Sequence, residues 1–134
     1  MMKTEIGILL VRLVTGVTFL IHGLDKFHGG IEGTGEFFDS LGIPAPAVMA
    51  GVVAIVEIVG GLALILGLGT RLFGAIFALV MVTAIFTAKA EAGFLGGYEL
   101  DLILLTVSLL LLLNGSKLVA LDQLFGRKKR RSRF

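Results

Sequence analysis

An acid in the middle of a long apolar run is the first residue that suggests chemistry. Glu57 interrupts the hydrophobic stretch Ala45–Leu68. A charged side chain at bilayer depth costs about 2.5 to 3.5 kcal/mol on insertion scales, so it persists where a partner or a function offsets that cost. Arg12 and Glu57 would lie roughly 9 and 15 Å from the same membrane surface at 1.5 Å per helical residue, a gap that an arginine side chain can span. We therefore predict a buried Arg12–Glu57 ion pair, whose ordinary role is to set helix register and whose functional role would be in catalysis.

More ionisable side chains gather at the opposite ends of the first and last apolar runs. His22 and Lys26 are four residues apart and share a helix face, and Glu99 and Asp101 begin the last run on the same side. Such groups usually face a bundle interior or a water-filled space, which favours a polar cavity open to that surface, although acids also stabilise a helix N-terminus without any further role. The candidate catalytic residues are His22, Glu57 and Glu99, and the candidate cofactor-binding residues are Arg12, Lys26 and Asp101.

The scarcity of sulfur and imidazole limits the cofactors. The chain has no cysteine, so it cannot run dithiol chemistry or hold an iron–sulfur cluster through thiolates. Its two histidines, His22 and His28, lie at the same helix end, so they cannot be the two axial ligands of a haem between facing helices. No metal site is predicted, because no standard ligand spacing is present. The cofactor stays open, with quinone as the candidate, and His22 is the natural proton carrier because histidine ordinarily changes charge near neutral pH.

The elements that must position these residues are membrane helices. Fifty-six per cent of the 134 residues are hydrophobic and the mean hydropathy is +0.99, well beyond a soluble domain. Lipid admits helices or closed barrels, and these continuous runs lack the alternation of barrel strands. The sequence therefore predicts an all-α, integral membrane four-helix bundle. Its four spans are Ile6–Phe27, Ala45–Leu68, Leu72–Ala88 and Tyr98–Leu113.

The long connection Gly29–Pro46 carries a further helical signal. Within Glu36–Leu41, the apolar side chains Phe37, Phe38 and Leu41 fall on one side of a helical turn, and Gly42 provides a C-terminal stop. We predict a short interfacial helical turn here. It either packs as a cap on the bundle or acts as a binding lid.

The basic residues predict the orientation. A four-span chain places most of them on one side, which by the positive-inside rule is the cytoplasm. They are Lys3, Arg71, Lys117, Arg127, Lys128, Lys129, Arg130, Arg131 and Arg133. We expect a multi-pass cell-membrane protein with cytoplasmic N- and C-termini and a first run that is retained, not a cleaved signal peptide. Residues 1–126 form the membrane domain and 127–134 a polybasic tail, either a topology determinant or a patch for anionic lipid or an acidic partner.

An ordered series of short motifs runs along nearly the whole chain. In sequence they are Arg12, His22-Gly23 with Lys26, Leu41-Gly42-Ile43-Pro44, Glu57 with Gly60-Gly61, Gly67-Leu68-Gly69-Thr70-Arg71, and Gly97-Tyr98-Glu99. This series resembles the DoxX family of small four-helix membrane proteins. The resemblance implies a link to membrane oxidoreduction, since some relatives are tied to thiosulfate oxidation with quinone as acceptor. The segments Asn114-Gly115-Ser116 and Ala120-Leu121-Asp122 depart from the family pattern.

Three functions are compatible with these residues, and enzymatic activity itself stays open. The first is a quinone-linked oxidoreductase subunit, whose ionisable residues move protons while a substrate or partner supplies electrons. The second is a non-catalytic anchor or assembly partner of a soluble redox enzyme. A proton-coupled carrier is less favoured, because the chain has no internal repeat, although a homo-oligomer would supply more spans. The bilayer is the one partner that the composition requires, and no nucleic-acid partner is expected.

Overall fold

The computed structural model describes residues 2–28, 30–89, 93–117 and 120–123, of which residues 88 and 89 are described by their backbone alone. Four helices are long and apolar enough to cross a membrane, which confirms the predicted all-α four-span fold. The described elements are α1 (Met2–His28), α2 (Ile31–Ser40), α3 (Pro46–Leu66), α4 (Thr70–Ala84), the π-helical turns η1 (Ile85–Lys89) and η3 (Phe94–Tyr98), and α5 (Glu99–Asn114). The polybasic tail, 127–134, lies outside the described residues.

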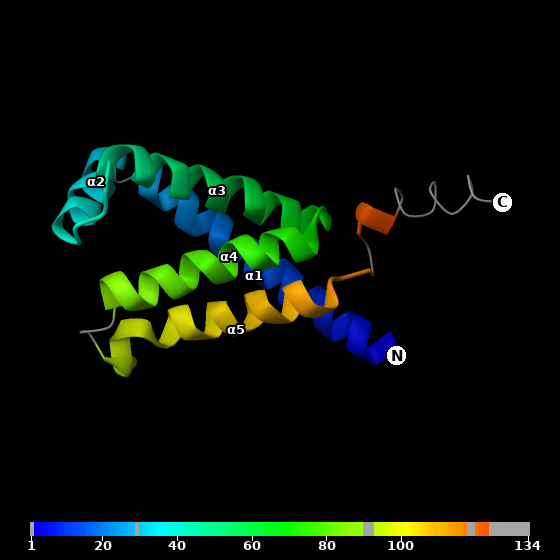
Figure 1. Ribbon diagram of the computed structural model, residues 1–134. Helices are drawn as coiled ribbons and strands as arrows, with labels where there is room; N and C mark the ends of the chain where they lie inside the picture. Colours follow the sequence, from blue (N-terminus) through cyan, green and yellow to red (C-terminus); the bar gives the residue numbers. More distant parts are fainter. Residues whose placement is uncertain (1, 29, 90–92, 118–119, 124–134) are drawn as a thin grey trace.

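The long helices form two pairs. α1 packs on α3 and α4 packs on α5, while contacts between the pairs are fewer. The start of α1 and the end of α5 lie at one end of the bundle, which we call the termini end (Figure 1). The short helix α2 packs against α3 at the opposite end, which we call the α2 end.

The pair α1–α3 is held at a fixed register by small residues. A Cβ atom added to Gly61 would lie 2.6 Å from the Gly16 carbonyl oxygen, and one added to Gly23 would lie 2.9 Å from that of Ala54. Backbones this close are the usual way to pack spans in lipid, where leucine surfaces gain nothing from association. Gly16 is therefore level with Gly61, and Gly23 is level with Ala54 and Glu57.

An aromatic contact joins the two pairs in the middle of the bundle. The rings of Phe19 on α1 and Phe77 on α4 are stacked with centroids 3.7 Å apart, and both side chains are buried. A Cβ at Gly60 would lie 2.5 Å from the Phe77 ring, so a glycine is needed where this ring meets α3. The stack thereby joins α1 to α4 between the termini end and the α2 end of the bundle.

The termini end is closed by the segment after α5. The backbone N–H of Leu121 donates to the Leu66 carbonyl (3.1 Å), and that of Asp122 donates to the Gly67 carbonyl (3.2 Å). The Asp122 carboxylate accepts the N–H of Gly69 (2.8 Å). Asp122, in one of the segments that depart from the family pattern, therefore fastens this segment to the α3–α4 turn.

The predicted interfacial turn is a ten-residue helix, α2. Its end at Ser40 is followed by Leu41 and by Gly42, whose φ of +77° suits the glycine stop expected there. α3 then begins at Pro46, whose missing N–H is not needed in a first helical turn. This short corner holds α2 against α3.

Candidate functional site

A cavity of about 830 Å³ lies between the two helix pairs at the α2 end. Its volume falls within the range of roughly 300 to 1,000 Å³ that is usual for small-molecule sites. The apolar walls come from α2, α3 and α4 and include Phe38, Met49, Val53, Leu79 and Val80. Five ionisable side chains complete the lining: His22, Lys26, Glu57, Glu99 and Asp101.

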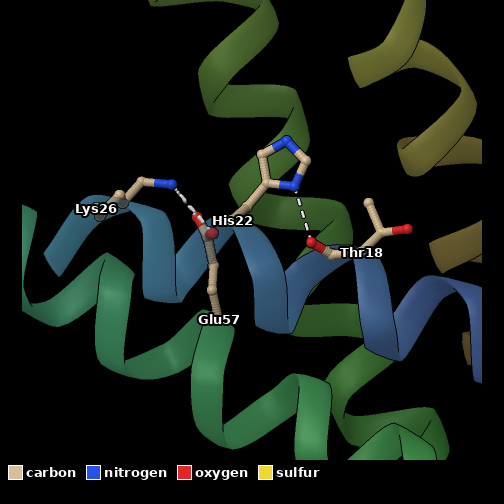
Figure 2. A network of polar contacts seen from close by, with 4 residues as sticks. All are labelled: Thr18, His22, Lys26 and Glu57. Atoms are coloured by element: carbon tan, nitrogen blue, oxygen red, sulfur yellow. Dashed lines mark hydrogen bonds and ion pairs between the residues drawn. The ribbon is translucent and has the colours of Figure 1, made fainter. Parts of the chain in front are cut away.

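Glu57 forms an ion pair with Lys26 on the neighbouring helix. The Lys26 ammonium lies 2.9 Å from Oε1 and 3.0 Å from Oε2 of Glu57, so it bridges both carboxylate oxygens (Figure 2). The Glu57 side chain is 4% exposed and that of Lys26 is 23% exposed. The acid is thus buried and neutralised, and the lysine stands at the cavity wall.

The predicted Arg12–Glu57 pair is wrong. Arg12 is fully buried at the termini end, where its guanidinium donates to the Ser116 hydroxyl (3.2 Å) and lies beside Gly67. Glu57 precedes Gly67 by ten residues of chain, about 15 Å of helix. The direction of the side chains completes the explanation, because Cβ atoms tilt toward a helix N-terminus. Arg12 therefore points toward the termini end, whereas Lys26 points toward Glu57.

His22 lies on α1 one turn before Lys26 and has a defined hydrogen bond. Its Nδ1 lies 2.8 Å from the Thr18 carbonyl oxygen, and the second ring nitrogen points away from α1 (Figure 2). A carbonyl oxygen can only accept, so Nδ1 carries the hydrogen. In the neutral ring, Nε2 is then an acceptor at the cavity, available to take a proton.

The two acids of α5 line the facing wall. Glu99 accepts the Gly96 N–H through Oε1 (3.2 Å), which fixes the carboxylate at the start of the helix. The Oδ2 atom of Asp101 is buried and has no hydrogen-bond partner within the described ranges. The protein's own atoms cover this oxygen, so it lies behind the cavity surface and is not exposed to a ligand.

The structure thus brings together five of the six candidate site residues, and Arg12 alone lies elsewhere. Asp25 faces a separate shallow depression on α1, with Ile21 and His28. Sequence reasoning missed Thr83 and Thr87, which line the cavity from α4 and η1 and whose four-residue spacing in an apolar run was the available signal. In the part of the chain that the structure describes, no group of three or more His, Asp or Glu side chains could hold a metal ion.

The sequence of this chain is similar to those of known proteins. The DoxX family model matches residues 7–90. The chain is 48% identical over 118 residues to the protein named "Putative oxidoreductase CatD" of Bacillus subtilis (strain 168), covering 88% of this chain and 86% of that protein. It is 38% identical over 95 residues to the "Uncharacterized membrane protein Rv3486" of Mycobacterium tuberculosis, covering 67% of this chain and 58% of that protein. No solved structure matches. With four apolar spans and a family match over most of its length, the chain belongs to the DoxX family.

Proposed function

We propose that this protein is a membrane subunit of an oxidoreductase and that a quinone binds in the cavity between the helix pairs. The observation that carries the proposal is the cavity itself: apolar walls of suitable volume with a few ionisable groups at one side. The printed name of the Bacillus subtilis relative, "Putative oxidoreductase CatD", supports the same class of function. A quinone is an apolar molecule that accepts two electrons and two protons, so its site must combine apolar contact with proton donors and acceptors.

The cavity residues fit such a molecule. The apolar walls from α2, α3 and α4 pack against the apolar part of the molecule. Lys26, held by Glu57, presents its remaining N–H at the wall and can bind a carbonyl oxygen. His22, through Nε2, and the carboxylate of Glu99 exchange protons with the bound molecule.

The deciding experiment compares variants in membranes of a deletion strain. His22→Ala, Glu57→Gln and Glu99→Gln should each lower quinone-dependent redox activity while the protein stays folded and inserted. Asp25→Asn is the matched control, because Asp25 lies on α1 outside the cavity. Full activity in all three cavity variants, at normal protein levels, would refute the proposal and favour a non-catalytic anchor for a soluble redox enzyme.

A further inference from the structure

The side chains at the cavity have far more hydrogen-bond acceptors than donors. His22 offers Nε2, because its other nitrogen is bound to Thr18. Glu99 offers the carboxylate oxygen that does not bind Gly96. A carboxylate oxygen accepts hydrogen bonds and cannot donate.

The hydroxyl groups at the cavity add acceptors as well. Thr83 donates its hydrogen to the Leu79 carbonyl (2.9 Å) and Thr87 donates to the Thr83 carbonyl (2.6 Å). Each hydroxyl has a single hydrogen, so what remains on these two side chains is oxygen lone pairs.

Lys26 is the one clear source of a donor among these groups. Two of its three N–H bonds are directed at Glu57, which leaves one. A carbonyl-bearing ring could use that single donor and would leave the acceptors unsatisfied. A ring that bears hydroxyl groups supplies the hydrogens that these acceptors require, and a buried acceptor without a donor weakens binding.

The polar and apolar walls also fix the direction of the ligand. His22 and Lys26 lie on one face of α1 (Figure 2), and Glu99 lines the same cavity from the start of α5. The walls from α2 and from the part of α4 before Thr83, with Phe38 and Leu79, are apolar. A molecule with a polar ring and an apolar chain would therefore place its ring between α1 and α5 and its chain along α2 and α4.

We infer that the cavity preferentially binds the reduced, hydroxyl-bearing form of a quinone that carries an apolar chain. This inference rests on the proposed function and adds to it the redox form and the orientation that the site selects. The ring hydroxyls donate to His22 Nε2 and Glu99 Oε2, and the chain lies on the apolar wall. Binding of the oxidised form is weaker because its carbonyl oxygens compete for the one donor of Lys26.

The test measures the affinity of the purified protein in nanodiscs for three probes that share one apolar chain. They are decyl hydroquinone, decyl benzoquinone and the dimethyl ether of decyl hydroquinone, in anaerobic equilibrium dialysis. We expect the hydroquinone to bind about tenfold or more tightly than either of the others. It donates two hydrogen bonds that they cannot, and each such bond typically changes the affinity by roughly fivefold. The ether matters because it keeps the ring and chain while removing the donors.

Two variants identify the acceptor. Glu99→Gln keeps the acceptor for Gly96 and replaces the other carboxylate oxygen with an N–H₂ donor of the same shape, so the preference for the hydroquinone should fall toward one. Asp25→Asn makes the same chemical change outside the cavity, and the preference should stay as in the unmodified protein. Equal shifts in both variants would overturn the assignment.

The binding measurements test the preference for the hydroquinone separately from the existence of a quinone site. Equal affinity for all three probes would overturn the inferred preference and leave the quinone site standing. Binding of none of them would overturn both the preference and the proposed function.

Discussion

Replacing Lys26 with methionine should destabilise the protein more than replacing Glu57 with glutamine. Lys26→Met leaves the carboxylate of Glu57, 4% exposed, without its counter-ion. Removing one member of a buried pair usually costs about 3 to 5 kcal/mol. Because Lys26 is 23% exposed at a cavity wall, water can compensate in part, and we expect roughly 2 to 3 kcal/mol for Lys26→Met. Glu57→Gln should cost roughly 1 to 2 kcal/mol, since the surviving ammonium can reach water.

The double variant decides whether the two side chains are coupled. Lys26→Met with Glu57→Gln should cost less than the sum of the single changes by about 1 kcal/mol or more, as expected for residues in direct contact. The free energy of unfolding is measured by titration with sodium dodecyl sulfate in mixed micelles. Far-UV circular dichroism is the suitable signal because the chain has no tryptophan.

The matched control is the same cycle with Arg12→Met in place of Lys26→Met. Arg12 lies at the termini end with Ser116, so its effect should add to that of Glu57→Gln within about 0.5 kcal/mol. Additivity for Lys26 and coupling for Arg12 would refute the reasoning, because it would mean that the register of α1 against α3 differs from the one described.

Two further predictions concern packing and orientation. Gly61→Ala should lower the midpoint of thermal unfolding measurably, because the added methyl group would meet the Gly16 carbonyl. Gly51→Ala is the control and should leave the midpoint unchanged, because no atom lies within 4 Å of a Cβ added there. Equal midpoints for the two variants would contradict the close contact of α1 and α3. A reporter active only in the cytoplasm should work when fused after Phe134 and fail when inserted near Gly33, as the positive-inside rule predicts, and the reverse result would invert the orientation.

Much of this fold could be predicted from the sequence because lipid imposes simple requirements. Each apolar run is long enough to span, and an even number of spans brings the ends of the first and fourth helices together. The same reasoning placed His22, Lys26, Glu99 and Asp101 at one end of the bundle, where the structure gathers them around one cavity. Their position along a helix was sufficient for that conclusion.

The partner of Glu57 could not be predicted from depth alone. The depth of a residue along its own helix does not give the register of α1 against α3. That register is set by the contact of Gly16 with Gly61. The tilt of side chains toward the helix N-terminus then favours Lys26 over Arg12. The cavity could not be predicted from the sequence either. Its size depends on the distance between the two helix pairs on the α2 side of the stacked Phe19 and Phe77 rings.

The most direct test of the account is the quinone content of the purified protein. Protein purified in mild detergent from its native membrane is extracted with organic solvent, and the quinone, oxidised plus reduced, is measured per chain. We expect an amount approaching one per chain for the unmodified protein. Val53→Trp, which fills the cavity wall, should remove it, whereas Ile55→Trp, on the exposed face of the same helix, should retain it. Equal quinone content in both variants, or none in the unmodified protein, would contradict the claim that this cavity is a quinone site.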